Sequence, residues 1–314
     1  MAVNLRRSLV ASAIALLPAG LIAGTVSAAN AAPAAPAAFP AHFAAPYLQI
    51  SSGDAGDMAA DMKASGDKYY TLAFLTSKSG CTLQWEDGGD SVGAFKSQIS
   101  SLQSAGGDVA ISFGGAGSTE LAQSCTSVSS LAAAYEKVVT TYNVFRLDFD
   151  IEGSPLDNSA SITRRDQALA QVQKWNSAVK VDYTLPVDPT GLESNATKLL
   201  KDSKTQGVKV SIVNIMTMDF GNGQNALNDA ESGAKATHSQ LESIFGSSST
   251  AAWNQLGLTP IAGKNDDNEN FTQSNAKTLE SFAASNGVGE LAFWEVDEYD
   301  KKVSYAYSKI FNAI

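Results

Sequence analysis

The residues best suited to chemistry lie in one short stretch, Phe145 to Gly153, with the sequence FRLDFDIEG. Hydrophobic residues at 145, 147, 149 and 151 alternate with Asp148, Asp150 and Glu152, and strict alternation is typical of a β-strand. The three carboxylates would share one face of the strand, roughly 6–7 Å apart at each second residue. Like charges this close raise the pKa of at least one group. The stretch therefore predicts a carboxylic acid that can donate a proton near neutral pH.

Two other interpretations of the acidic row are open. An edge strand could carry three acids on a solvated face, but the hydrophobic flanks of this stretch disfavour an edge position. Hard cations such as Ca²⁺ or Mg²⁺ also bind carboxylate oxygens, so the row could form a cation site. Loss of activity in EDTA would support the cation site.

The acidic stretch is the fourth of eight segments with strand character. Helical segments alternate with them, which predicts parallel βα units. Eight such units in about 270 residues predict a single-domain (β/α)₈ TIM barrel, with an open doubly wound sheet as the alternative. The predicted strands are Pro46–Ile50, Tyr69–Leu75, Asp108–Phe113, the acidic stretch, Val179–Val187, Val208–Asp219, Leu258–Ala262 and Gly289–Val296. The predicted helices are Asp54–Ala64, Ser91–Ser104, Glu120–Tyr142, Ala160–Trp175, Leu192–Thr205, Asn228–Phe245, Thr272–Asn286 and a terminal helix to Phe311.

Several predicted strands end in residues that could bind a ligand, and active sites of such barrels gather at that end. The third ends in Ser112–Gly115, whose glycines would let the backbone approach a ligand or a neighbouring strand closely, although taken alone the motif favours a structural turn. The fifth carries Tyr183, and the sixth ends in Met216–Asp219. The eighth carries Trp294, which could pack in the core or stack on a sugar ring.

Together these residues resemble the bacterial chitinases of glycoside hydrolase family 18. The match comprises the SxGG motif at Ser112–Gly115, Asp148-x-Asp150-x-Glu152, the Met216–Asp219 segment and Trp294, in that order from about Pro46 to the C-terminus. The resemblance implies a TIM barrel that hydrolyses β-1,4 links between N-acetylglucosamine units without a cofactor or a metal. The N-terminal region is similar to that of secreted actinobacterial members.

The resemblance also implies a role for each acid. In this family the acetamido oxygen of the sugar is the nucleophile, so Glu152 would protonate the glycosidic oxygen and the reaction would retain configuration. Asp150 would orient the acetamido N–H and stabilise positive charge, while Asp148 would lie deeper and bias which neighbour is protonated. Asp219 matches an acid near the acetamido group, and Trp294 would form the floor beneath the sugar. The strand geometry agrees, because Asp150 and Glu152 lie on one side and Asp150 is badly placed to attack from the opposite face.

The chain departs from the family pattern at two positions. The longer motif DxxDxDxE has an acid where this chain has Phe145, remote from the chemistry. Many members have a Tyr where this chain has Met218, which cannot donate a hydrogen bond to the acetamido oxygen. We therefore expect Tyr183 to supply that hydroxyl and to bind substrate together with Met216 and Asp219. On this hypothesis Tyr183→Phe lowers turnover about 10²-fold.

The N-terminal residues predict export. Arg6 and Arg7 precede a hydrophobic run with small-x-small cleavage sites near residue 28, which is typical of a secretory signal peptide over residues 1–30. An Ala/Pro-rich connector is predicted over 31–45, followed by the catalytic domain over 46–314. The formal net charge of −10 disfavours nucleic acid and anionic membranes as partners. We expect a secreted monomer that binds chitin or N-acetylglucosamine oligosaccharides.

The remaining chemistry of the chain is sparse. Its two cysteines, Cys81 and Cys125, are expected to form a disulfide in an oxidising compartment, the alternative being two buried thiols. With only two histidines, zinc chemistry is not expected. Other functions left open are an endo-β-N-acetylglucosaminidase and a non-catalytic sugar-binding barrel. Trp85 and Trp253 could line a cleft or pack, and packing is favoured for Trp253; Asn265 and Asp266 are expected at the active end of the barrel without an assigned role.

Overall fold

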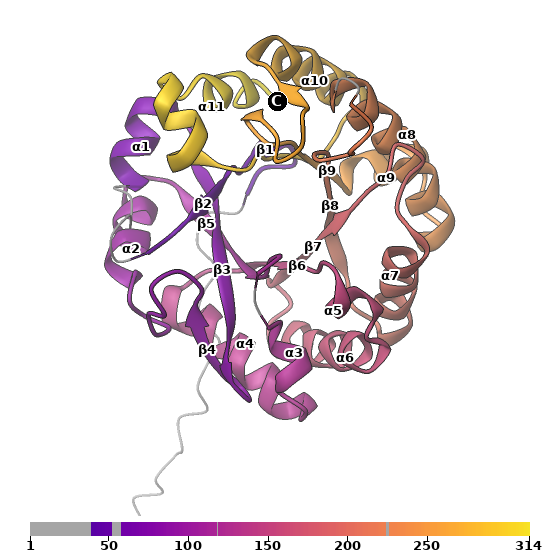
Figure 1. Ribbon diagram of the computed structural model, residues 1–314. Coiled ribbons are helices and arrows are strands. Elements are labelled where there is room, and N and C mark those ends of the chain that lie inside the picture. The colour runs from indigo at the N-terminus through magenta and orange to yellow at the C-terminus, as the bar shows by residue number, and fades with distance from the viewer. Residues whose placement is uncertain (1–38, 52–57, 118, 224–225) are drawn as a thin grey trace, which may run out of the picture. The chain divides into compact units, whose positions relative to one another are not determined.

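A ring of parallel strands with helices on its outer side forms the described part of the chain (Figure 1). The computed structural model describes residues 39–51, 58–117, 119–223 and 226–314. The predicted signal peptide and residues 31–38 of the predicted connector lie outside these ranges. The strand and helix alternation of the sequence is thus confirmed as a (β/α)₈ barrel.

The strands follow the hydrophobic and alternating segments of the sequence, and each predicted strand overlaps an observed one. All residues of the strands Asp108–Gly114 and Arg146–Asp150 are buried, because side chains fill the barrel and helices cover its outside. The bounds are β1 Phe43–Ala44, β2 Tyr47–Gln49, β3 Tyr69–Ser79, β4 Thr82–Trp85, β5 Asp108–Gly114, β6 Arg146–Asp150, β7 Lys180–Pro186, β8 Val210–Met216, β9 Leu256–Thr259, β10 Gly263–Lys264, β11 Asn270–Phe271 and β12 Glu290–Leu291. The strands β1, β4, β10 and β11 were not predicted.

The barrel closes through the segment Phe43–Gln49. The strand β1 pairs in parallel with β12, and β2 pairs in parallel with β3. The backbone N–H of Tyr47 donates to the carbonyl of Phe293 over 3.0 Å, while Thr71 on the other side donates to Pro46 over 3.0 Å. One stretch of chain therefore bonds to neighbours on both sides, and this closure excludes the open doubly wound sheet.

The helices form the outer layer, and the short helices α5 and α9 were not predicted. The predicted helix over 120–142 is two helices, because Cys125 is extended (φ −85°, ψ 98°) and Ser127 then caps a new helix by accepting from the N–H of Ser130. The bounds are α1 Met58–Ser65, α2 Lys96–Ser104, α3 Leu121–Ser124, α4 Val128–Tyr142, α5 Ser154–Asp157, α6 Ser159–Trp175, α7 Ser194–Gln206, α8 Ala226–Phe245, α9 Ser249–Asn254, α10 Gln273–Asn286 and α11 Ala306–Phe311, with a π-helical turn at Val296–Asp300 and a 3₁₀ turn at Lys301–Val303.

A disulfide joins Cys81 to Cys125, as the sequence predicts. Cys81 lies in the turn between β3 and β4, and Cys125 follows α3, so the bond ties this hairpin to the helical layer (Figure 1). The hydroxyl of Ser124 donates to the hydroxyl of Ser77 over 2.6 Å beside it. The hairpin and α3 are therefore held together by both a covalent bond and hydrogen bonds.

The amino end of the barrel is closed by residues that the sequence analysis assigned to the connector. Arg146 pairs with Asp182 over 2.6 Å inside the barrel, and its guanidinium lies 4.7 Å from the ring centroids of both Phe39 and Phe43. A buried charge of this kind is stabilised by its partner and by the two aromatic faces. Residues 39–45 thus belong to the barrel, and the predicted connector is shorter than 31–45.

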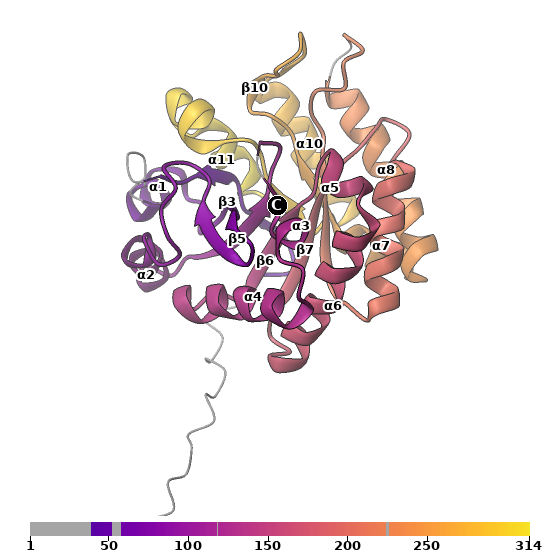
Figure 2. The ribbon, with the colours of Figure 1, turned by 60° about the horizontal axis from the view of Figure 1, so that its bottom comes forward.

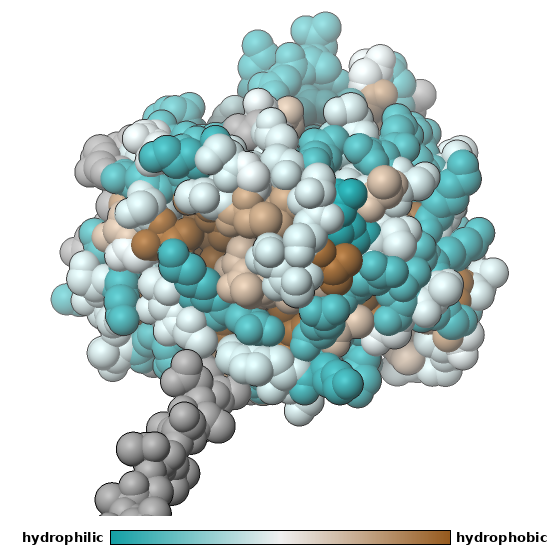
Figure 3. Space-filling model, turned by 90° about the horizontal axis from the view of Figure 1, so that it is seen from below, coloured by the Kyte–Doolittle hydropathy of each residue, from teal (hydrophilic) through white to brown (hydrophobic). Residues whose placement is uncertain are grey.

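The outer surface is mixed in polarity. Seen from below, hydrophobic residues surface only in patches bordered by hydrophilic ones (Figure 3). No helix in the described ranges is both long enough and apolar enough to cross a membrane.

Candidate active site

The acidic row lies on β6, and its first two carboxylates point into the barrel. Asp148 is 3% exposed and Asp150 is 6% exposed, while Leu147 and Phe149 lie on the opposite face of the strand and are fully buried. The Phe149 ring packs edge-on against Tyr135 of α4, with centroids 5.2 Å apart. β6 has β5 on one side and β7 on the other, so the acids do not lie on an edge strand.

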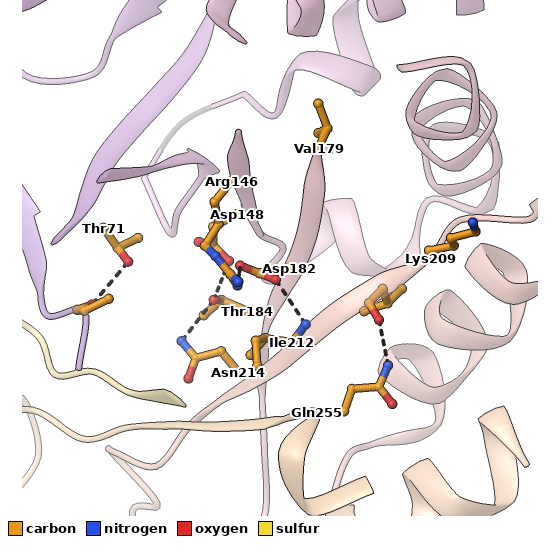
Figure 4. Close-up of polar contacts among 12 residues, drawn as sticks. Thr71, Arg146, Asp148, Val179, Asp182, Thr184, Lys209, Ile212, Asn214 and Gln255 are labelled. Atoms are coloured by element: carbon orange, nitrogen blue, oxygen red, sulfur yellow. Dashed lines mark hydrogen bonds and ion pairs between the residues drawn. The ribbon is translucent and has the colours of Figure 1, made fainter. Parts of the chain in front are cut away.

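Asp148 accepts hydrogen bonds from three sides. Ser112 donates over 2.6 Å, Thr184 over 2.8 Å and Tyr47 over 3.1 Å. Thr184 lies between Asp148 and Asn214, whose amide donates to the Thr184 hydroxyl over 3.1 Å (Figure 4). Burial raises the pKa of Asp148 to about 7, and the three hydrogen bonds oppose that rise. The position of Asp148 below the other two acids is as predicted.

The Asp150 and Glu152 carboxyls lie above Asp148 and interact with each other. Burial raises the pKa of Asp150 well above its ordinary value, and the charges of Glu152 and Asp148 raise it further. Burial also raises the pKa of Glu152, while its interaction with Asp150 opposes this. The negative surroundings thus favour a proton on this pair, which is the proton that general acid catalysis requires.

Two glycines let β5 approach the acidic strand closely. Gly114 has φ +107°, and a Cβ at this position would lie 2.1 Å from the carbonyl oxygen of Asp150. Gly115 has φ +82°, and its Cβ would lie 2.7 Å from the ring of Phe74. Its backbone N–H donates to the same Asp150 carbonyl over 3.1 Å. Of the two uses predicted for this motif, the structure shows close approach to a neighbouring strand.

A cavity of about 310 Å³ opens above the acids at the carboxyl ends of the strands. The Trp294 indole lies at one wall, parallel to the Phe74 ring within 8° and 5.7 Å from it. Glu152 and Trp294 thus face one space that is large enough for a sugar ring. The lining residues are Tyr47, Phe74, Ala116, Asp150, Glu152, Thr184, Met216, Met218, Asp219, Thr259, Ile261, Asp266 and Trp294.

The residues predicted at the end of the sixth strand, which is β8 in the structure, line this cavity as well. Met216 and Met218 are half-buried in its wall, and Asp219 is exposed at the rim with φ +51°. A carboxylate oxygen of Asp219 accepts from the N–H of Asp267 over 3.2 Å. Asp219 lies in the loop after β8, and Asp267 lies in the turn between β10 and β11; Figure 2 shows β10 at the upper edge of the molecule. Burial, followed by the charges of Asp266 and Asp267, raises the pKa of Asp219.

Tyr183 does not lie in the cavity, and its predicted role in substrate binding is wrong. It is fully buried on the outer face of β7, where its hydroxyl donates to Asp166 of α6. The neighbouring residues Asp182 and Thr184 point into the barrel, so Tyr183 must point out of it. Among the described lining residues of the cavity, the tyrosine is Tyr47, on β2.

Tyr183→Phe is therefore expected to leave kcat on a chitin oligosaccharide within about twofold of the original, because no substrate group is within its reach. Removing the donor to buried Asp166 should lower the free energy of unfolding by about 1–2 kcal/mol. Steady-state kinetics and urea denaturation of the same preparation measure both quantities. A 10²-fold fall in kcat would restore the original assignment.

Several cavity residues were missed by the sequence analysis. Tyr47, Phe74 and Thr184 come from three different strands, and none belongs to a motif. The signal for Thr184 is its position two residues beyond Asp182, on the inward row of β7. Tyr47 and Phe74 follow short hydrophobic runs and carry no comparable signal.

The residues left unassigned are now placed. Trp85 is fully buried, and its indole N–H donates to the Tyr142 hydroxyl over 3.0 Å, so it packs. Trp253 stacks on His238 with centroids 4.2 Å apart, outside the cavity. Asp266 lines the cavity, whereas Asn265 is buried and donates to Glu269 over 3.4 Å. In the described ranges, no group of three or more His, Cys, Asp or Glu side chains is arranged to hold a metal ion.

Three buried carboxyls are expected to make the stability of the fold depend on pH. Burial raises the pKa of Asp67 and Asp148 to about 7 and that of Asp166 to about 8, against about 3.9 in an unfolded chain. A raised pKa in the folded state stabilises the fold fully below about pH 4, and this stabilisation is lost as the pH rises through about 7–8. The melting temperature should therefore fall by roughly 5 °C or more between pH 5 and pH 8. Thermal denaturation in matched buffers at pH 5 and pH 8 measures this difference. A higher melting temperature at pH 8 than at pH 5 would contradict the raised pKa values of these carboxyls.

The chain is similar to known proteins along most of its length. The family model for glycosyl hydrolases family 18 matches residues 49–261. The "Probable bifunctional chitinase/lysozyme" of Escherichia coli (strain K12) is 38% identical over 274 residues, which are 80% of this chain and 30% of that protein. "Endochitinase 11" of Metarhizium anisopliae is 38% identical over 268 residues, 80% of this chain and 51% of that protein. The chain thus spans about half of these curated relatives, or less.

Solved structures agree with the fold and the family match. The catalytic domain of a hyperthermophilic chitinase from Pyrococcus furiosus is 33% identical with a TM-score of 0.79, covering 87% of this chain and 95% of that domain. Catalytic-site mutants of active domain 2 of the Pyrococcus furiosus chitinase, complexed with chito-oligosaccharides, give 32% identity and the same TM-score of 0.79, covering 87% of this chain and 94% of that one.

Proposed function

Because the chain belongs to glycosyl hydrolases family 18, we propose that it is a secreted chitinase that cleaves β-1,4 links between N-acetylglucosamine units. The observation that carries this proposal is the coupled Asp150–Glu152 pair beside Trp294 in one sugar-sized cavity. The names of the relatives point to the same substrate, including the complex of a Pyrococcus furiosus chitinase with chito-oligosaccharides.

In this proposal the sugar on the non-reducing side of the bond lies in the cavity, on the indole of Trp294. Glu152 donates its proton to the glycosidic oxygen as the bond breaks. The acetamido oxygen of the same sugar attacks the anomeric carbon and forms a cyclic oxazolinium ion. Water then opens this ring, with Glu152 taking the proton back, so the configuration is retained.

Asp150 is the proposed partner of the acetamido group. One of its carboxylate oxygens is buried and has no hydrogen-bond partner among the described residues. An unpaired buried acceptor is costly, so a donor supplied by substrate, such as the acetamido N–H, would satisfy it. Asp148, held by three donors, lies below the pair, and in its ionised form its charge would favour the positive oxazolinium ion.

The test of this function is a substrate panel run with and without EDTA. Purified protein is incubated with chitohexaose, with a glycoprotein carrying N-glycans and with peptidoglycan, and the products are separated by mass. If chitohexaose is the only one of the three substrates that is cleaved, the result supports the proposal. Release of N-glycans without chitohexaose cleavage would instead identify an endo-β-N-acetylglucosaminidase. Binding without any cleavage would identify a sugar-binding barrel, and inhibition by EDTA would favour the cation site.

A second candidate activity follows from one comparison. The Escherichia coli relative is described as a probable bifunctional chitinase/lysozyme. The peptidoglycan arm of the panel tests this activity directly, and products from both polymers would support a dual function.

The proposal of secretion is supported by the Cys81–Cys125 disulfide, since such bonds persist mainly in oxidising compartments. The expected result is a protein in the culture medium that begins near residue 29 or 31, after the small-residue cleavage sites. Mass spectrometry of the intact secreted protein measures this start. A protein that stays inside the cell with its first 30 residues attached would contradict it.

A further inference from the structure

A second, larger cavity borders the catalytic acid on the side away from Trp294. Its volume is about 700 Å³, more than twice that of the cavity above Asp148. We call it the polar cleft, and its lining residues are Thr76, Ser77, Gln84, Gly115, Ala116, Gly117, Thr119, Gln123, Glu152, Gly153, Ser154 and Pro155. Glu152 and Ala116 line both spaces, so the two cavities meet at the proton donor.

The position of Glu152 between the cavities gives the polar cleft its place in the reaction. If the sugar that reacts lies against Asp150 and Trp294, the oxygen that Glu152 protonates lies at the junction. The sugar on the other side of that oxygen is the leaving group, and it must extend into the polar cleft. This step rests on the function proposed above.

The lining of the polar cleft is unusual for a site that would hold sugar rings. It offers hydroxyls, backbone groups and two amide side chains, and none of its described lining residues is aromatic. The described lining of the polar cleft therefore offers no aromatic side chain on which a sugar ring could stack, whereas Trp294 offers one in the cavity above Asp148. A sugar in this cleft would be held at its polar edges by hydrogen bonds.

Gln84 and Gln123 are the two side chains best placed to make those bonds. Both are half-buried, and neither amide group has a hydrogen bond to another described residue. Gln84 is on β4 opposite Thr76 of β3, so the two side chains share one face of the hairpin. Gln123 is on α3, so the two amides come from different elements that both line the cleft.

The disulfide connects the elements that carry the two amides. Cys81 is in the turn of the hairpin that carries Gln84, and Cys125 lies two residues after Gln123. The N–H of Ser77 in the hairpin also donates to the carbonyl of Thr119, in the loop just before α3, over 3.1 Å. The disulfide bond thus joins the hairpin that carries Gln84 to the segment that carries Gln123, although neither cysteine itself lines the cleft.

We propose that Gln84 and Gln123 bind the sugar chain on the leaving-group side of the cleaved bond, and that the Cys81–Cys125 disulfide fixes the separation of these two amides. The ligand class is a neutral oligosaccharide with free hydroxyl and acetamido groups. Both glutamines are specificity-determining residues, and neither takes part in bond cleavage.

The experiment compares two substrates that differ only on this side of the bond. Chitohexaose places sugars in the polar cleft, whereas 4-methylumbelliferyl β-chitobioside places only an aryl group there. We expect Gln84→Ala and Gln123→Ala each to lower kcat/KM on chitohexaose about fivefold, and the double variant about 20-fold, as for loss of one and two neutral hydrogen bonds. On the aryl chitobioside each variant should stay within about twofold of the original. Gln167→Ala, an exposed glutamine on α6, is the matched control and should change neither rate.

The disulfide is tested in the same way. The double variant Cys81→Ala, Cys125→Ala should lower the chitohexaose rate selectively and raise KM on that substrate, provided thermal denaturation shows that it folds. If it does not fold, the glutamine variants alone decide. Equal losses on both substrates, or no loss on chitohexaose, would overturn the inference while leaving the proposed function intact. If the unchanged protein cleaves neither substrate, both proposals fail together.

Discussion

Glu152→Gln is expected to lower kcat on chitohexaose by about 10³-fold, with little change in KM. The amide has nearly the shape of the carboxylic acid, but it cannot give a proton to the glycosidic oxygen. The leaving sugar is a poor leaving group without that proton, so the loss should fall on the chemical step. Initial rates at several substrate concentrations separate kcat from KM.

A leaving group that needs no proton provides the sharpest control for this prediction. The loss on 4-methylumbelliferyl β-chitobioside should be much smaller, because its phenolate departs more easily. Glu280→Gln, on the outer helix α10, should leave both rates unchanged. Equal losses on the two substrates would show that Glu152 has another role than proton donation.

Asp150→Asn is expected to lower kcat by about 10²-fold, the size of effect seen when one group that stabilises transition-state charge is removed. The side chain is buried between Asp148 and Glu152, with one oxygen unpaired among the described residues. An amide fills the same space, but it carries no charge to stabilise an oxazolinium ion.

The pH profile of the same variant distinguishes a structural defect from this role. The Asp150 carboxyl is coupled to Glu152, so its removal should move the pH at which activity is lost. A variant that merely folds badly would lose activity with an unchanged profile. Retention of the original kcat would contradict the assignment of Asp150 to the acetamido group.

Much of the fold could be predicted because the sequence repeats one physical pattern. Strands that are covered on both sides must be hydrophobic, and helices must carry a hydrophobic stripe. The alternation of strands and helices can therefore be recognised in the sequence. The acidic row stood out because Asp148 and Asp150 break the hydrophobic composition that a buried strand otherwise has. The cysteine pair could be predicted because the chain has only two.

Tyr183 was predicted to bind substrate because a tyrosine carries a hydroxyl, but its position in the alternating pattern of β7 places it outside the barrel. In β7 the hydrophobic residues Val181, Tyr183 and Leu185 occupy one row, and Asp182 and Thr184 the other. Because Asp182 and Thr184 pair in register with Asp148 and Asp150, the second row faces the barrel interior. The alternation therefore already placed Tyr183 outside, next to α6.

Other features depend on contacts between distant parts of the chain and left no local signal. The role of Phe43 in closing the barrel requires β12, about 250 residues later. Phe74 lines the cavity beside Trp294, which stacks on it from about 220 residues later in the chain. The polar cleft is built from a hairpin and a short helix that the disulfide brings together, and neither was predicted in its observed form.

The most direct test of the account is the configuration of the sugar that is first released. Chitohexaose is cleaved in EDTA, and proton NMR follows the anomeric signals of the new reducing ends before they interconvert. Attack by the acetamido group followed by water predicts that the β-anomer appears first. Initial release of the α-anomer would contradict a substrate-assisted mechanism, and so would rapid cleavage of the fully deacetylated hexamer, which has no acetamido group.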